Sequence, residues 1–239
     1  MTARPMSFRS TANFAGLAYT RWLCRREYRR QTFRRLNERP VEYAFLFRQV
    51  ARHQPRSVLD VGTGTTALPH LLRTCGTVVT AIDSMRAFWF AGEANRHWHV
   101  IHDDILATRL TEQFDLVTCV SVLEHISEHQ KAVASMLRLV APGGHLLVTA
   151  PYHERRYCPN VYELPGSELQ GQALPPYATQ AFSRGELNTW LAAGSRLIEQ
   201  EYWQFYDGEY WAVGHRLPVP RQVGPHDLHQ IGCMLLQKA

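Results

Sequence analysis

Two glycines follow a short apolar run at residues 57–61. The run reads SVLDV, the glycines are Gly62 and Gly64, and a helical pattern begins at about Thr66. Glycines this close let the backbone turn tightly between a strand and a helix. In parallel sheets such a turn lies at the carboxyl edge, where ligands bind. The sequence therefore predicts an α/β fold with a ligand site at this turn.

The rest of the chain continues this alternation of short apolar runs and helical patterns. Capping boxes at Ser127/Gln130 and Ser183/Glu186 predict two helix starts, and the Pro-rich stretch 215–226 reads as a connection. Strands alternating with helices indicate a doubly wound, mostly parallel sheet. We expect strands at residues 57–61, 77–82, 98–101, 114–120, 145–150, 197–206 and 228–237.

The N-terminal 56 residues differ from the rest in charge. They carry 13 arginines and 3 acidic residues, a net of +10, whereas residues 57–239 have a net of −5. Residues 1–16 read as loose, and helices are expected at 17–36 and 41–53. We therefore expect a basic helical extension over residues 1–55 and a second domain over 56–239. A solvated helix face and an anionic partner (nucleic acid, membrane surface or substrate) both fit this asymmetry.

Cysteine usage and hydropathy indicate in which cellular compartment the protein is expected. The five cysteines are scattered and form no CxxC pair, which predicts reduced thiols and no zinc site. No run of about 18 apolar residues is present, so no membrane span is expected. These features favour a cytoplasmic protein.

Asp60 and Asp83 narrow the choice of ligand. Asp60 lies two residues before the first glycine, where a carboxylate would repel a pyrophosphate but suits a ligand with an ammonium and a sulfonium cation. Asp83 ends the next strand, where an acid accepts hydrogen bonds from ribose hydroxyls. Dinucleotide enzymes share that second feature, so Asp83 does not discriminate between the ligands. Asp60 disfavours a nicotinamide oxidoreductase.

The chain resembles the class I S-adenosylmethionine-dependent methyltransferases over residues 56–150. Four pieces match in order: the DVGTG turn, Asp83, the segment Asp103-Asp104-Ile105, and FDLVTCVSVLEHI followed by APGGHLLVTAP. Thr66 departs from the third glycine that many members have. The resemblance implies a Rossmann-like, seven-stranded sheet whose last strand is antiparallel, with S-adenosylmethionine as cofactor.

The resemblance also implies which residues hold the cofactor. All of these residues are expected at, or just beyond, the carboxyl ends of the strands. Asp60 and the backbone of Gly62, Thr63 and Gly64 would hold the methionine part, Asp83 with Ser84 the ribose, Asp104 and Ile105 the adenine, and Cys119 and Val120 would line the methionine side.

Methyl transfer needs a general base only when the acceptor must lose a proton. His125 and His153 are the candidate bases. Some relatives bind magnesium through Glu-x-x-Glu-His near His125, but Ser121 stands where the first glutamate would be, so no metal is expected. The Tyr- and Pro-rich segment 151–180 offers flat rings suited to a sugar, an aromatic metabolite or a nucleobase, or a structural cover.

The leading hypothesis is methyl transfer to a small-molecule or glycan acceptor, at oxygen. The Asn/Asp-Pro-Pro-Tyr/Phe signature of many enzymes that methylate amino groups of nucleobases or glutamine is absent after residue 117. An RNA methyltransferase using the basic arm and a non-catalytic binding module remain alternatives. Extensions in this family often fold over the cleft, so the arm is also interpreted as a lid.

Overall fold

The computed structural model describes residues 8–32, 36–84, 95–173 and 175–239. The chain consists of two compact units, residues 1–40 and 41–239. The division falls earlier than the expected boundary after residue 55. Helix α2 (Arg39–His53) accounts for the difference, because its buried residues Val41, Phe45, Leu46 and Val50 pack in one core cluster with the sheet residue Val58.

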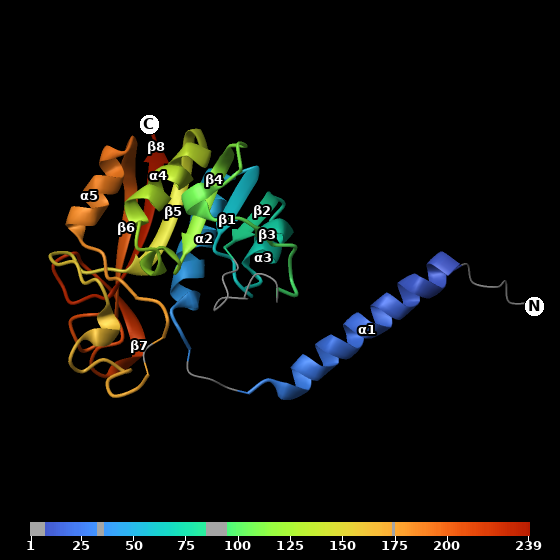
Figure 1. Cartoon of the computed structure of the whole chain (residues 1–239), viewed down its shortest axis with the longest axis horizontal. Helices are drawn as coiled ribbons and strands as arrows, with labels where there is room; N and C mark the ends of the chain where they lie inside the picture. The colour runs from blue at the N-terminus through green and yellow to red at the C-terminus, as the bar shows by residue number, and fades with distance from the viewer. Residues whose placement is uncertain (1–7, 33–35, 85–94, 174) are drawn as a thin grey trace, which may run out of the picture. The chain divides into compact units, whose positions relative to one another are not determined.

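The larger unit is built on one mixed sheet (Figure 1). The strand order is β3-β2-β1-β4-β5-β8-β6-β7, and the first five strands are parallel. Strand β8 is antiparallel to β5 and β6, and β7 is antiparallel to β6. The bounds are β1 Ser57–Val61, β2 Val78–Asp83, β3 Ile101–His102, β4 Phe114–Val120, β5 Val140–Pro151, β6 Ser195–Tyr206, β7 Arg216–Val223 and β8 Ile231–Lys238.

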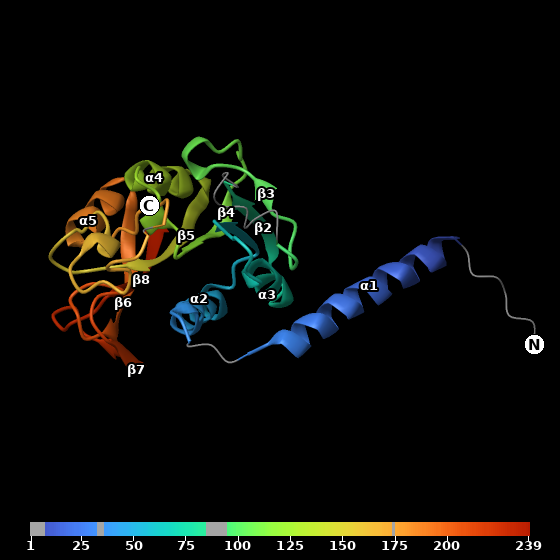
Figure 2. The same cartoon turned by 60° about the horizontal axis from the view of Figure 1, so that its bottom comes forward.

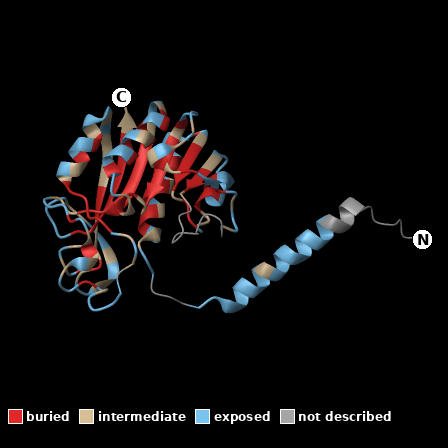
Figure 3. Ribbon diagram, in the orientation of Figure 1, coloured by how far each residue is buried: buried red, intermediate tan, exposed pale blue. Residues whose placement is uncertain are grey.

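Helices cover both faces of the sheet, as the turned view in Figure 2 shows. Helices α2 and α3 (Leu68–Thr74) lie on one face, and α4 (His129–Leu139) and α5 (Arg184–Ala192) lie on the other. Each face has its own buried apolar cluster. The central strands β1, β4 and β8 are buried on both sides (Figure 3), which explains their continuous apolar runs.

The Rossmann-like, mostly parallel α/β architecture is confirmed, but the expected seven strands become eight. The added strand, β7, lies inside the stretch that was interpreted as a Pro-rich connection. Pro218 and Pro220 belong to it, and β7 is the last strand of the order. Proline is tolerated on an edge strand because its missing N–H can face away from the ladder. The two prolines are therefore the reason why the sequence pattern did not predict this edge strand.

Two helix starts also differ from the sequence expectation. Helix α4 begins at His129 with Glu128 before it and no side-chain cap, so the predicted capping box at Ser127 is wrong. The capping box of Ser183 and Glu186 is confirmed. Helix α1 (Phe8–Arg30) begins inside the segment that reads as loose. No helix among the described residues is long and apolar enough to cross a bilayer.

Candidate active site

The glycine turn lies at the carboxyl end of β1, as the sequence predicts. Gly62 and Gly64 have φ angles of +75° and +57°, whereas Thr66 is not among the positive-φ residues. A Cβ on Gly62 would lie 2.5 Å from both Cγ atoms of Val122. Gly62 therefore supplies both a left-handed turn and room for the loop after β4. Thr66 is compatible with the turn.

Asp60 is 2% exposed and ties the turn to the neighbouring strand. Thr63 Oγ1 donates to Asp60 Oδ2 at 2.6 Å, and Thr118 Oγ1 on β4 donates to Asp60 Oδ1 at 2.7 Å. A buried carboxylate is costly unless such donors satisfy it. The two hydroxyls therefore hold a negative group, in a set orientation, beside the glycine turn.

Asp83 is 4% exposed and ends β2. Its Oδ2 accepts a hydrogen bond of 2.8 Å from Gly64 N. Asn95, which no sequence pattern indicated, donates from Nδ2 to the carbonyl oxygens of Gly64 and Thr66. The two side chains that hold the turn's backbone thus come from outside the turn. Ser84 follows Asp83 and is half-buried.

The Asp103–Ile105 segment has a divided role. Asp103 is buried and accepts from Thr108 Oγ1 at 2.5 Å, and its carboxylate also accepts from Arg109 N. Asp104 accepts from Leu106 N and caps the short 3-10 helix Ile105–Ala107, while the Ile105 side chain is buried in the core. Local hydrogen bonds thus hold the loop that follows β3.

Cys119 and Val120 end β4, and both side chains are buried, one in the core cluster of each face. Burial raises the pKa of the Cys119 thiol, with Glu124 and Asp60 adding to the shift. Both side chains are therefore taken up by core packing at the carboxyl end of β4. The next residue, Ser121, has a φ of +50°.

Glu42 anchors this unusual conformation from α2. The carboxylate is fully buried, and its Oε1 accepts from Ser121 Oγ at 2.5 Å and from Thr149 Oγ1 at 2.7 Å. Thr149 in turn accepts from Ser121 N. The network joins α2 to the ends of β4 and β5, and no sequence pattern indicated it.

Replacement of Glu42 by alanine is expected to lower the free energy of unfolding by about 1–3 kcal/mol, because the Thr149 hydroxyl, which is buried, and the Ser121 hydroxyl, which is partly buried, lose their acceptor. Urea unfolding measures the change. Glu112→Ala removes an exposed acid and serves as the control, with an expected change within about 0.5 kcal/mol. Equal effects for both variants would contradict the anchoring role of Glu42.

His125 lies in the short 3-10 helix Leu123–His125 directly after β4. Its Nδ1 is 3.0 Å from the Ala178 carbonyl oxygen, and its ring meets Tyr177 edge-on with centroids 4.8 Å apart. A carbonyl oxygen only accepts, so Nδ1 of His125 is the donor in this contact. Gln180 Nε2 donates to the carbonyls of Glu124 and Ile126. Segment 151–180 therefore packs against the loop after β4.

His153 follows β5 and is engaged at both nitrogens. Nδ1 accepts from Arg155 N and Arg156 N at 3.2 and 3.0 Å, and Nε2 is 3.3 Å from Glu209 Oε1. Tyr210 stacks on the ring, with centroids 5.0 Å apart. The lone pair of the neutral ring is thus directed at backbone amides. Among the described residues, no cluster of three or more metal-ligating side chains lies together.

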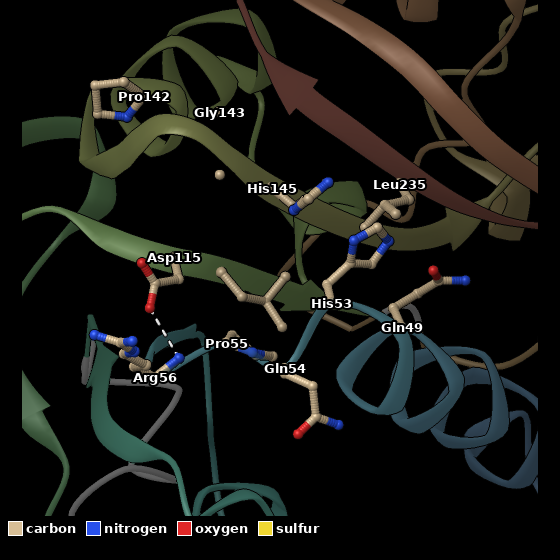
Figure 4. A pocket seen from close by; sticks show the side chains of 12 residues that line it. Gln49, His53, Gln54, Pro55, Arg56, Asp115, Pro142, Gly143, His145 and Leu235 are labelled. Atoms are coloured by element: carbon tan, nitrogen blue, oxygen red, sulfur yellow. Dashed lines mark hydrogen bonds between the residues drawn. The ribbon is translucent and has the colours of Figure 1, made fainter.

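A cavity of about 380 Å³ lies elsewhere, at the amino ends of the strands (Figure 4). His53 at the end of α2 and His145 on β5 line it, with ring centroids 4.1 Å apart. Burial lowers the pKa of both rings, as it does for His129 and His229. The cavity shares no lining residue with the glycine turn.

These lowered pKa values predict that the protein loses stability in acid. Below the ordinary histidine pKa of about 6.5 the unfolded chain binds protons that the folded rings resist, so the free energy of unfolding falls as pH falls. Urea unfolding at about pH 7.5 and pH 5.5 measures this loss. His53→Gln/His145→Gln should reduce the loss, whereas His97→Gln/His99→Gln, at exposed positions, should not. Stability that is unchanged across this range would contradict the prediction.

A parallel sheet with a glycine turn after β1, an acid ending β2 and an antiparallel strand beside β5 defines a class I S-adenosylmethionine-dependent methyltransferase. The family of methyltransferase domains matches residues 28–208, and the chain belongs to this family. Ubiquinone biosynthesis O-methyltransferase of Coxiella burnetii is 26% identical over 171 residues, which cover 67% of this chain and 71% of that protein.

Two solved structures share the fold. The magnesium protoporphyrin IX methyltransferase of Synechocystis superposes with a TM-score of 0.56 at 14% identity, over 93% of this chain and 94% of that one. The 1,6-didemethyltoxoflavin-N1-methyltransferase of Burkholderia thailandensis gives 0.55 at 16% identity, over 100% and 93%.

Proposed function

We propose that the chain transfers the methyl group of S-adenosylmethionine to a hydroxyl oxygen of a small ring-bearing acceptor. The observation that carries the proposal is the position of His125 directly after the carboxyl end of β4, with its Nδ1 atom 3.0 Å from the Ala178 carbonyl oxygen and its ring against Tyr177. The oxygen specificity in the name of the Coxiella burnetii relative supports the same chemistry.

The residues at the turn fit this cofactor. Asp60 and Asp83 are buried carboxylates on either side of Gly62–Gly64, so the site favours a ligand that carries positive charge. Asp60 and the backbone of Gly62, Thr63 and Gly64 would hold the methionine part, beside the backbone of Cys119 and Val120. Asp83 with Ser84 would hold the ribose, and Asp104 and Ile105 the adenine.

The cofactor supplies a methyl group already activated on a sulfonium, so the protein must align the acceptor and exclude water. His125 Nε2 would take the hydroxyl proton as the oxygen attacks. Tyr177 packs against this ring and offers a flat face to a ring-bearing acceptor. His153, held by Tyr210 and two backbone amides, would have a structural role and would not serve as the base.

A methylation assay tests this function. The protein is incubated with S-adenosylmethionine and a panel of dihydroxybenzoates, their diamino analogues, simple hydroxylated sugars and a short RNA. S-adenosylhomocysteine release and product mass are measured. Methyl transfer to the hydroxylated compounds is the expected result. Methylation of the diamino compounds or the RNA alone would overturn the proposal.

A further inference from the structure

The second half of helix α1 carries an unbalanced positive charge. Residues 21–30 contain five arginines and one glutamate, a net charge of +4. The arginines are Arg21, Arg25, Arg26, Arg29 and Arg30, and all five are exposed. Within the part of the chain that the structure describes, no carboxylate forms an ion pair with any of them. This charge is therefore left for a partner outside the described chain.

The five arginines share one side of the helix. An α-helix turns by about 100° per residue, so the five positions lie within about 180° of its circumference. Trp22 and Tyr19 fall in the same half of the circumference, and Glu27 falls outside it. The five arginines and the two rings thus make up one side of α1, its basic face.

The basic face destabilises the helix that carries it. Its like-charged pairs at a spacing of four residues are Arg21/Arg25, Arg25/Arg29 and Arg26/Arg30. Such pairs lower the stability of a helix in water, and an anionic partner removes their repulsion. The face therefore favours a partner that brings several negative charges, spaced over the roughly 15 Å that ten helical residues span.

Two exposed rings lie among these charges. Tyr19 and Trp22 are 62% and 54% exposed, and they stack with ring centroids 6.0 Å apart. The guanidinium of Arg26 lies 5.8 Å from the Trp22 ring centroid. Nucleobases stack on aromatic rings and on guanidinium planes. The basic face thus offers cations to phosphates and flat surfaces to bases.

We propose that the basic face of α1 binds single-stranded nucleic acid, with phosphates paired to the arginines and bases stacked on Tyr19 and Trp22. Basic N-terminal arms often bind nucleic acid. A strand with unpaired bases fits the two rings, because the bases of a single strand are open to stacking on aromatic side chains. The nucleic acid is a ligand of the N-terminal extension, and the methyl acceptor remains the small hydroxylated molecule.

A lipid surface fits α1 less well. Residues 9–20 read RSTANFAGLAYT, in which an arginine and four polar side chains stand among the apolar ones. The large apolar side chains Phe8, Phe14, Leu17 and Leu23 are spread around the whole circumference of the helix. A helix that lies in a membrane interface needs its apolar side chains on one side. The arrangement of α1 therefore favours the nucleic acid.

Fluorescence anisotropy of the full chain tests the proposal. The probes are labelled single strands of RNA and of DNA, about 12 nucleotides long, within the usual site sizes of about 4–16. Binding should weaken about a hundredfold between about 50 and 200 mM salt, as five phosphate contacts to a single strand require. The tighter probe shows whether the ligand is RNA or DNA. The titration needs neither cofactor nor methyl acceptor, so its result is independent of the proposed methyl transfer.

Two variants separate the charges from the rings. Arg25→Gln/Arg29→Gln should weaken binding at least about tenfold at about 100 mM salt and make the salt dependence shallower. Trp22→Ala should weaken binding at least about fivefold and leave the salt dependence unchanged, because it removes stacking and no charge. Arg73→Gln/Arg221→Gln, at exposed positions in the larger unit, should change neither quantity. Glutamine and alanine are good helix formers, so α1 should stay folded in these variants.

Three results would overturn the proposal. The first is that neither probe binds at about 50 mM salt. The second is binding that either Arg25→Gln/Arg29→Gln or Trp22→Ala leaves intact. The third is tighter binding to anionic phospholipid vesicles than to either oligonucleotide, which would assign α1 to a lipid surface instead.

Discussion

His125→Gln is expected to lower kcat by about 10²–10⁴-fold, the usual contribution of a general base. In the proposed function Nε2 of His125 takes the proton of the acceptor hydroxyl, and a glutamine side chain cannot act as this base. The affinity for S-adenosylmethionine should stay unchanged, because no role in holding the cofactor is assigned to His125. Initial rates give kcat, and calorimetry gives cofactor affinity.

His153→Gln is the matched comparison, because the lone pair of its neutral ring already accepts from two backbone amides. The expected loss in kcat is below about tenfold, well under that of a general base. A large loss in His153→Gln beside an active His125→Gln would reverse the assignment of the two histidines.

Gly62→Ala is expected to disrupt the cofactor site. An alanine there needs a left-handed backbone, which costs about 1–2 kcal/mol. Its Cβ would also lie 2.5 Å from Val122, and overpacking of this kind costs about 1–3 kcal/mol more. Because the clash pushes the turn and the loop after β4 apart, S-adenosylmethionine should bind at least about tenfold more weakly, a loss of about 1.4 kcal/mol.

Gly143→Ala separates the clash from the strain of the backbone. Gly143 has a φ of +73°, and a Cβ there would meet no described atom within 4 Å beyond its chain neighbours, so this variant carries the strain alone. Urea unfolding should show a smaller loss for Gly143→Ala than for Gly62→Ala. Gly62→Ala/Val122→Ala should regain part of the difference. Equal losses for both single variants would contradict the role of the Val122 contact.

The sequence predicts well what depends on neighbouring residues. The glycine turn, the acid that ends β2 and the capping box at Ser183 each lie within a few residues of the element they define. It fails where a local rule has an exception that only the fold reveals. Prolines in residues 216–223 indicate a connection, yet the last position in the sheet accommodates them as β7.

Distant contacts around the site could not be predicted. Glu42 reaches Ser121 and Thr149 across 79 and 107 residues of chain, and Asn95 reaches Gly64 across 31. No spacing rule links such positions in a single sequence. In the sequence, Glu42 looks like any polar residue of a helix, and its buried contacts appear only once α2 is packed against the sheet.

Calorimetric titration with S-adenosylmethionine tests the central claim most directly. The chain should bind S-adenosylmethionine and S-adenosylhomocysteine and should not bind NAD. Asp60→Ala and Asp83→Ala should each weaken binding by about 1–3 kcal/mol, the cost of losing a charged partner. Absence of binding to either adenosyl ligand, or unchanged affinity in both variants, would contradict the placement of a methyl-donor site at this turn.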